Sequence, residues 1–256
     1  AFWDADTLRI TDRLQRDRRH FHVPRFWLTG ESYVISDDDA KNVMVVDFAK
    51  GQLDFVMRGH EAPVLSVSQW NGNENVDDAR VVSVDVQGHV KHWDPNTGLE
   101  TLALQPFDFQ PAAVAFEPEE KWIVAANNTN VVLFDGHAQT IANDISVGLV
   151  RKIEFSPDSS LMAIAYSRGI IIWHTDGWQA VTTETFERFV DGFCFTSSHE
   201  LAVVLAQSEV LLLDADTQQR VVLRSADRVS AAREVAHIPN SNQLAIAVEQ
   251  NVELWD

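Results

Sequence analysis

One short sequence mark recurs along the chain at nearly constant intervals. It is an apolar run that ends in a bulky apolar residue followed by Asp, or in one case by His. The marks are Phe2-Trp3-Asp4, Val45-Val46-Asp47, His92-Trp93-Asp94, Leu133-Phe134-Asp135, Ile172-Trp173-His174, Leu212-Leu213-Asp214 and Leu254-Trp255-Asp256. Successive marks lie 39 to 47 residues apart. A unit of this length can hold four short β-strands, so the spacing predicts an all-β chain of similar units ending near residues 47, 94, 135, 174, 214 and 256.

Each interval has the pattern of strands separated by turns. In the clearest one, residues 150–155, 161–166 and 170–173 are apolar runs, and turn-forming residues such as Ser156-Pro157-Asp158 separate them. The same order of runs occurs at 114–116, 122–126 and 131–134. Because runs such as 161–166 are almost continuously apolar, we expect strands that are buried on both faces.

The second interval carries a more specific pattern. It begins with Arg58-Gly59-His60 and ends with His92-Trp93-Asp94, and it resembles a WD repeat, which opens with Gly-His and closes with Trp-Asp. Because similar marks recur at this spacing, the resemblance covers the whole chain. It implies a WD40-type β-propeller of six or seven four-stranded blades, with residues 1–256 forming a single propeller domain.

The resemblance also implies a hydrogen-bonded chain that pins this blade together. The matching positions are His60, Ser83 and Trp93, but Gln87 stands before the turn glycine where the family usually has Asp. Asp85, two residues earlier, is the candidate substitute. The other units lack the full set, so we expect apolar packing to hold them.

The ends of the chain leave the closure of the propeller open. The segment from Thr7 to Thr11 is a candidate outer strand that would complete the blade ending at Asp256. The alternative is a seven-bladed ring or a larger assembly of which this chain is a part. The start without Met and the end at Asp256 favour a piece of a longer multidomain protein.

The composition limits the classes of partner. The formal net charge is −18, with 38 acidic and 20 basic side chains, and such a field repels nucleic-acid phosphates. Solubility is the plainer explanation of this charge, and a preference for basic partners is the other. No apolar run is long enough to span a membrane and no signal peptide is evident, so we expect a cytoplasmic protein.

Two features are candidate partner-binding sites. Five arginines lie between residues 12 and 25, and Arg16, Arg18, Arg19 and His20 are expected to suit an acidic or phosphorylated peptide. The plainer interpretation is that these arginines pair with carboxylates of the same protein. Trp178 follows Asp176-Gly177 in an expected surface loop, where it is either a binding anchor or packed against its own blade.

Motifs for metal binding and catalysis are weak. The polar segments 37–39 and 71–78 lack the residue order of a calcium loop, His20 and His22 have no cysteine partners, and the single cysteine, Cys194, lies in an apolar run typical of a buried, inert thiol. We therefore predict no metal, no cofactor and no disulfide. The favoured function is a scaffold for protein or peptide partners. A propeller hydrolase with axial carboxylates and a purely architectural subunit are the alternatives.

Overall fold

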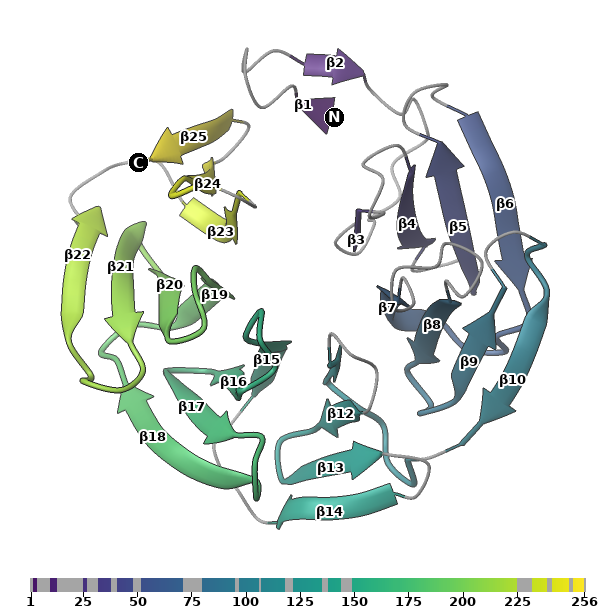
Figure 1. Ribbon diagram of the computed structural model, residues 1–256, viewed down its shortest axis with the longest axis horizontal. Coiled ribbons are helices and arrows are strands. Elements are labelled where there is room, and N and C mark those ends of the chain that lie inside the picture. Colours follow the sequence, from purple (N-terminus) through teal and green to yellow (C-terminus); the bar gives the residue numbers. More distant parts are fainter. Residues whose placement is uncertain are drawn as a thin grey trace. The chain divides into compact units, whose positions relative to one another are not determined.

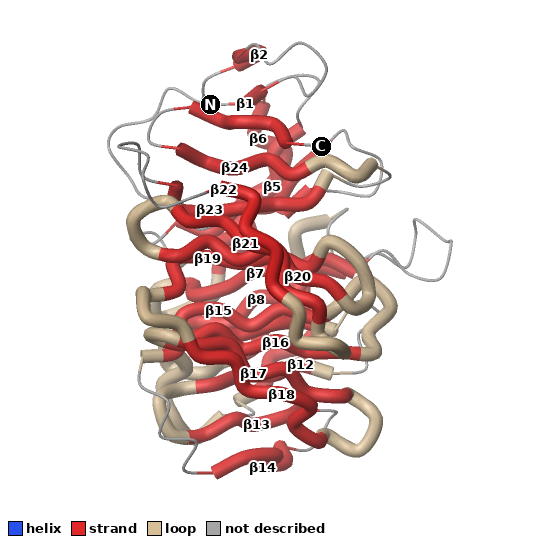
Figure 2. The backbone as a smooth tube through the Cα atoms, turned by 90° about the vertical axis from the view of Figure 1, so that its left-hand side faces the viewer, coloured by secondary structure: helices blue, strands red, loops and turns tan. Residues whose placement is uncertain are grey.

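The structure is a computed structural model, and it describes fifteen ranges of the chain. These are residues 2–3, 10–12, 25–26, 32–37, 41–47, 52–70, 80–94, 97–105, 107–117, 122–134, 138–143, 149–224, 232–238, 241–248 and 251–255. Within these ranges the secondary structure is strand and turn, with no helix (Figure 2). Two compact units divide the chain, residues 1–114 with 136–138, and residues 115–135 with 139–256.

The first unit contains one strand pair and two four-stranded antiparallel sheets (Figure 1). The pair is β1 (Phe2–Trp3) with β2 (Ile10–Asp12). The first sheet is β3 (Arg25–Phe26), β4 (Ser32–Asp37), β5 (Asn42–Asp47) and β6 (Gln52–Arg58). The second is β7 (Val64–Trp70), β8 (Arg80–Asp85), β9 (Val90–Trp93) and β10 (Glu100–Leu104). Of the outer strand expected at 7–11, only residues 10 and 11 are described; they belong to β2, which pairs with β1.

The second unit holds most of a third sheet and three further sheets. The third sheet is β11 (Ala113–Phe116), β12 (Ile123–Ala126), β13 (Asn130–Phe134) and β14 (Ala138–Asn143). The fourth is β15 (Val150–Phe155), β16 (Leu161–Tyr166), β17 (Gly169–His174) and β18 (Gln179–Thr185). The fifth is β19 (Val190–Phe195), β20 (Glu200–Leu205), β21 (Glu209–Asp214) and β22 (Arg220–Arg224). The last has three described strands, β23 (Ala232–His237), β24 (Leu244–Val248) and β25 (Asn251–Trp255).

The sequence marks have one structural position. Six of the seven marks lie at the end of a third strand, which stops at the bulky residue of the mark or one residue later: β5, β9, β13, β17, β21 and β25. The strands expected at 150–155 and 161–166 are β15 and β16, and the run 170–173 is extended by one residue at each end in β17. All six residues of β16 are buried, as its unbroken apolar character predicts.

A β-bulge recurs near the start of the first strand of four sheets. The register shifts between Val64 and Ser66, Val150 and Lys152, Val190 and Gly192, and Ala232 and Glu234. A bulge changes the direction in which a side chain projects. Lys152, Gly192 and Glu234 therefore occupy equivalent positions on β15, β19 and β23.

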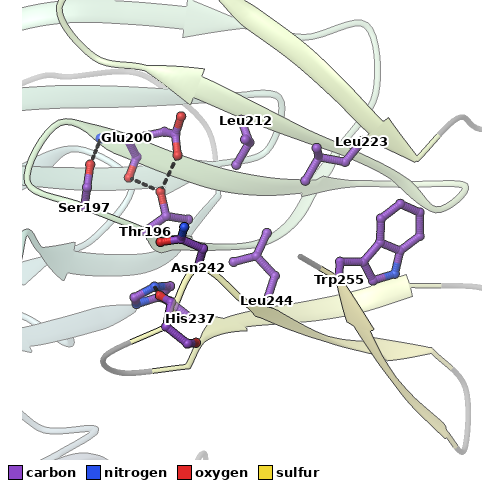
Figure 3. A pocket seen from close by; sticks show the side chains of 10 residues that line it. Thr196, Ser197, Glu200, Leu212, Leu223, His237, Asn242, Leu244 and Trp255 are labelled. Atoms are coloured by element: carbon purple, nitrogen blue, oxygen red, sulfur yellow. Dashed lines mark hydrogen bonds between the residues drawn. The ribbon is translucent and has the colours of Figure 1, made fainter.

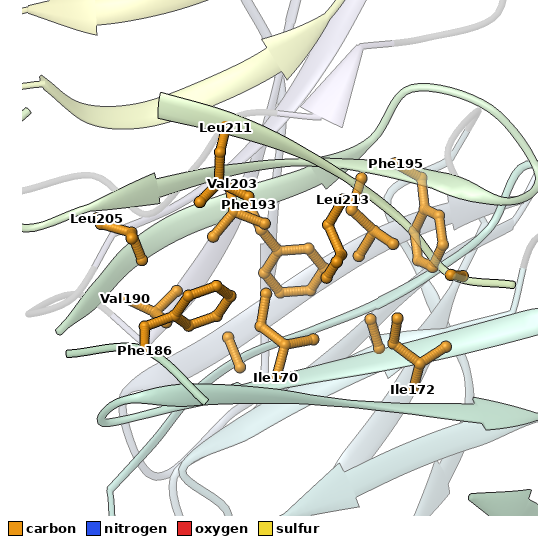
Figure 4. Close-up of a cluster of buried hydrophobic side chains, with 14 of the residues drawn as sticks. Ile170, Ile172, Phe186, Val190, Phe193, Phe195, Val203, Leu205, Leu211 and Leu213 are labelled. Atoms are coloured by element: carbon orange, nitrogen blue, oxygen red, sulfur yellow. The ribbon is translucent and has the colours of Figure 1, made fainter. Parts of the chain in front are cut away.

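The best-defined core lies between the fourth and fifth sheets. Figure 4 shows Ile170 of β17 beneath Phe193 of β19 and Ile172 beneath Phe195, with Val203 and Leu211 above Phe193. These side chains are at most 4% exposed. Since each sheet buries one face against the next, apolar packing between neighbouring sheets holds this region together.

Candidate functional site

A groove of about 580 Å³ lies between the fifth sheet and the last sheet (Figure 3). Two equivalent turns form one end of it, the turn that joins β19 to β20 and the turn that joins β23 to β24. Strands β21, β22, β24 and β25 form the other end. The lining residues are Thr196, Ser197, Glu200, Leu212, Leu223, His237, Ser241, Asn242, Leu244 and Trp255.

The turn end of the groove is polar and internally hydrogen-bonded. Thr196 Oγ1 donates to Glu200 Oε1 at 2.7 Å, and Ser197 Oγ accepts the backbone N–H of Glu200 at 3.1 Å. His237 Nε2 lies 2.8 Å from the carbonyl oxygen of Ser241, to which it donates. These bonds fix the turns, so the polar end is preorganised.

The strand end of the groove is apolar. Leu212 and Leu223 of the fifth sheet face Leu244 and Trp255 of the last sheet (Figure 3). The Trp255 indole is half-buried, and its Nε1 donates to Glu253 Oε2 at 3.1 Å. The same carboxylate oxygen lies 3.5 Å from Nη1 of the fully buried Arg224 side chain. Glu253 therefore contacts both the Trp255 indole, which lines the groove, and the buried Arg224 guanidinium.

The chemistry of the groove suits binding. Ser241 Oγ donates to the carbonyl of Ile238, Ser197 Oγ bonds the backbone of its own turn, and His237 Nε2 is a donor to a carbonyl. The hydroxyls thus stabilise turns, and His237 Nε2 has no free lone pair with which to activate one of them. An apolar trough beside fixed polar groups is the usual composition of a ligand site.

The four residues expected to pin the second sheet lie together in the structure. Trp93 Nε1 donates to Ser83 Oγ at 2.8 Å, and Ser83 Oγ lies 2.7 Å from His60 Nε2. His60 Nδ1 lies 3.1 Å from Asp85 Oδ2. A consistent assignment runs in one direction: the indole donates to the serine, the serine to the imidazole, and the imidazole to the carboxylate.

Burial sets the protonation state of His60 in this chain of hydrogen bonds. His60 is 6% exposed, and burial lowers its pKa below the ordinary value of 6.5, outweighing the hydrogen bond to Asp85. The imidazole is therefore neutral at pH 7. Asp85 Oδ1 also accepts the backbone N–H groups of Gln87 and His89, at 2.9 and 3.0 Å, so Asp85 both fixes the turn and receives the histidine.

The other candidate residues have different environments. Arg16, Arg18, Arg19 and His20 lie outside the described residues, as do residues 71–78 and Asp38-Asp39. Trp178 ends the turn between β17 and β18, is half-buried, and contacts Trp122 of the third sheet. Cys194 is buried, and burial raises the pKa of its thiol to about 12.

An ion cluster joins the first strands of three consecutive sheets. Lys152 Nζ lies 3.0 Å from Glu154 Oε2, 3.4 Å from Glu234 Oε1 and 2.6 Å from the carbonyl oxygen of Phe193. Gly192 stands between Lys152 and Glu234, and a Cβ there would lie 2.8 Å from Glu234 Oε1. The missing side chain lets the lysine reach across one strand to the carboxylate.

This cluster does not favour hydrolysis. Burial alone would lower the pKa of Lys152, but Glu154 and Glu234 outweigh it and raise that pKa. Burial also raises the pKa of Glu234 more than Lys152 lowers it. Since both carboxylates are bound to one ammonium group, the arrangement is a structural ion cluster, and the hydrolase alternative gains no support from it.

Across the described ranges, no group of three or more His, Cys, Asp or Glu side chains could hold a metal ion. Within the same ranges, no helix is long and apolar enough to span a membrane.

Comparisons with known proteins agree with this architecture. Residues 51–94 match the family model "WD domain, G-beta repeat". No curated protein matches the sequence. Among solved structures, 1609 chains match, so the fold alone indicates no particular role. One is a chain of the "Crystal Structure of Mitotic Checkpoint Complex", with a TM-score of 0.77 and 16% identity over 99% of this chain and 79% of that chain.

Sheets, repeat marks and structural match together define the class: the fold is an all-β, WD40-type β-propeller, as the sequence predicts. Within that fold, the stretch that matches the WD-repeat family model, residues 51–94, runs from β6 through β7, β8 and β9. The number of blades, six or seven, stays a prediction.

No motif in the sequence predicts the groove. Its polar end includes Thr196, Ser197 and Glu200 from one turn and Ser241 and Asn242 from the other, and both segments have the composition of ordinary turns. The sequence offers one indication of the groove: the two segments occupy equivalent places in successive repeats. Turns at equivalent places in adjacent sheets lie side by side.

Proposed function

We propose that this chain is a non-catalytic scaffold that binds a protein or peptide partner, and that the groove between the fifth and last sheets holds an extended segment of that partner. Propellers place their turns and loops at the ends of rigid sheets, where binding residues concentrate. The similar solved chain belongs, by its printed name, to a complex, and this analogy supports an interaction role.

The observation that carries the proposal is that the groove has one apolar end and one polar end. An apolar side chain of the partner fits against Leu223 and Trp255, where water is displaced from half-buried apolar surface. The adjacent polar end offers the Asn242 amide and the Glu200 carboxylate to the partner's backbone or to a cation. The groove volume of about 580 Å³ lies within the range of side-chain and small-ligand sites.

The net charge supports the class of partner. A formal charge of −18 disfavours nucleic acid and favours segments that carry cations. We propose a cytoplasmic setting, within a larger protein or assembly, as the context of this binding. The arginine-rich segment around Arg16, Arg18, Arg19 and His20 is proposed as a separate contact for an acidic or phosphorylated peptide.

The test fills the groove without removing any group that stabilises the fold. Asn242 lines the groove and is exposed, so Asn242→Trp places an indole in the cavity. The matched control is Thr183→Trp at an exposed position of β18 in the fourth sheet. Both variants and the unmodified chain are used to capture proteins from extract of the native source, after thermal melts verify folding.

The proposal predicts a set of partners that the unmodified chain and Thr183→Trp capture and that Asn242→Trp loses. Capture of the same partners by all three proteins would place the binding site elsewhere. Loss with both tryptophan variants would mean that the effect is nonspecific, and it would also contradict the assignment of the groove.

A further inference from the structure

One carboxylate lines the groove between the fifth and last sheets without a cationic partner. Of the described residues that line this groove, Glu200 is the one Asp or Glu, and none is Lys or Arg. Glu200 is half-buried, and its Oε1 accepts the Thr196 hydroxyl at 2.7 Å. Within the described ranges no Lys, Arg or His side chain forms an ion pair with it. A carboxylate held in place by a hydroxyl and lacking a counter-ion is complementary to a cation.

The sheet register places this carboxylate on the same face as the apolar end of the groove. Ala202 of β20 lies directly opposite Leu212 of β21, so their side chains project to the same side of the sheet. Glu200 is two residues from Ala202, and side chains two residues apart on a strand share a face. The positions of Glu200 and Leu212 are therefore offset by about 7 Å along the strands, and both line the groove (Figure 3).

An exposed valine extends the apolar end of the groove. Val221 of β22 lies opposite Leu212, so it projects to the same side, and it is 56% exposed. Leu223 of the same strand lines the groove. The apolar surface thus continues from the groove towards the outer strand of the sheet, where an aliphatic side chain of a partner would remove it from water.

These positions specify the order of residues in a bound segment. An extended segment places every second side chain on one face, about 7 Å apart, which matches the offset between Glu200 and Leu212. We propose that the groove selects an extended segment in which a lysine or arginine lies two residues from an aliphatic residue. The cation pairs with Glu200, and the aliphatic side chain packs against Leu212 and Leu223. This inference rests on the proposed function and names the class of segment that the groove binds.

The test titrates the full chain with three pentapeptides and follows the Asn242 side-chain amide and the Trp255 indole by NMR. The first is acetyl-leucyl-threonyl-lysyl-threonyl-leucinamide, in which lysine is two residues from a leucine in either direction. The second has glutamine in place of lysine. The third, acetyl-leucyl-leucyl-threonyl-threonyl-lysinamide, keeps the composition and changes the spacing. We expect saturable shifts with the first peptide and an affinity about 2- to 5-fold lower for each of the other two.

A pair of variants assigns the effect of charge to one residue. Glu200→Gln keeps an oxygen that can accept the Thr196 hydroxyl and removes the charge. It should lower the affinity for the lysine peptide about 2- to 5-fold and leave the affinity for the glutamine peptide unchanged. The matched control is Glu187→Gln, at an exposed position between β18 and β19, which should leave both affinities unchanged.

The outcomes separate this inference from the proposed function. Equal affinities for the lysine and glutamine peptides, or for the two isomers, would overturn the inference, while shifts of the groove signals would still support the proposed function. An equal loss in Glu200→Gln and Glu187→Gln would also overturn it, because net charge and not Glu200 would then attract the lysine. Absence of shifts with every peptide would overturn it too, and partner capture with Asn242→Trp judges the proposed function separately.

Discussion

The Trp93 indole donates a hydrogen bond to Ser83 Oγ at 2.8 Å, and both side chains are essentially buried. Ser83 in turn lies 2.7 Å from His60 Nε2. One hydroxyl therefore links the third strand of the second sheet to the segment that precedes its first strand. Because these groups are buried away from water, a group that loses its partner here has no water molecule to replace it.

We predict that Ser83→Ala lowers the free energy of unfolding by roughly 1–3 kcal/mol, because it leaves the buried Trp93 N–H and the His60 nitrogen without a partner. Denaturant unfolding measures the change. The control is Ser66→Ala, a half-buried serine on β7 of the same sheet, for which we expect a change within about 0.5 kcal/mol. Equal effects of the two substitutions on the free energy of unfolding would show that the hydrogen-bonded chain does not contribute to stability.

Stability should depend on pH through His60. Burial lowers its pKa in the folded state, so below about pH 6.5 the unfolded chain binds the proton more readily. The contribution of His60 is therefore fully present above its unfolded pKa and is lost as the pH falls towards the folded pKa. Between pH 7.5 and 5.5, the free energy of unfolding should fall less steeply for His60→Asn than for the unmodified chain. The two slopes should differ by at most ~1.4 kcal/mol per pH unit, as measured by denaturant unfolding. Parallel declines would refute this linkage.

Lys152→Met should destabilise the second unit, since it leaves Glu154 and Glu234 close together without their cation. Loss of one partner of a buried ion pair costs ~3–5 kcal/mol, and the 29% exposure of the lysine side chain places the expected loss below that range. Chemical denaturation provides the measurement. If the added substitution Glu234→Gln fails to recover part of the loss, repulsion between the carboxylates is not its cause.

The arginine-rich segment yields a separate prediction. Changing Arg16, Arg18 and Arg19 to Glu reverses the charge of a segment expected to bind acidic or phosphorylated peptides. Affinity capture from native extract should lose those partners while the melting temperature stays unchanged. Retention of every partner by the triple variant would leave these arginines without a binding role.

The fold was predictable because it depends on a pattern repeated along the chain. Apolar runs such as that of β16 are buried on both faces, and six of the seven marks lie at the end of a third strand. The hydrogen-bonded chain of the second sheet was predictable only in part, since Gln87 departs from the WD pattern. The geometry was needed to show that the Asp85 carboxylate accepts the hydrogen bond from His60.

Sites built between repeats could not be predicted from one sequence. Lys152 and Glu234 are 82 residues apart, and their contact depends on equivalent bulges and on the missing side chain of Gly192. The groove likewise combines two turns of ordinary composition. The sequence indicates Trp178 as a binding candidate, but its contact with Trp122 depends on how adjacent sheets pack.

Hydrogen–deuterium exchange tests most directly whether the groove is the binding site. Backbone exchange is measured for the chain alone and in complex with a partner that it captures. We predict slower exchange in the complex at residues 196–200 and 241–244, the two turns of the groove. Protection confined to other segments, with these two turns unchanged, would contradict the proposed function.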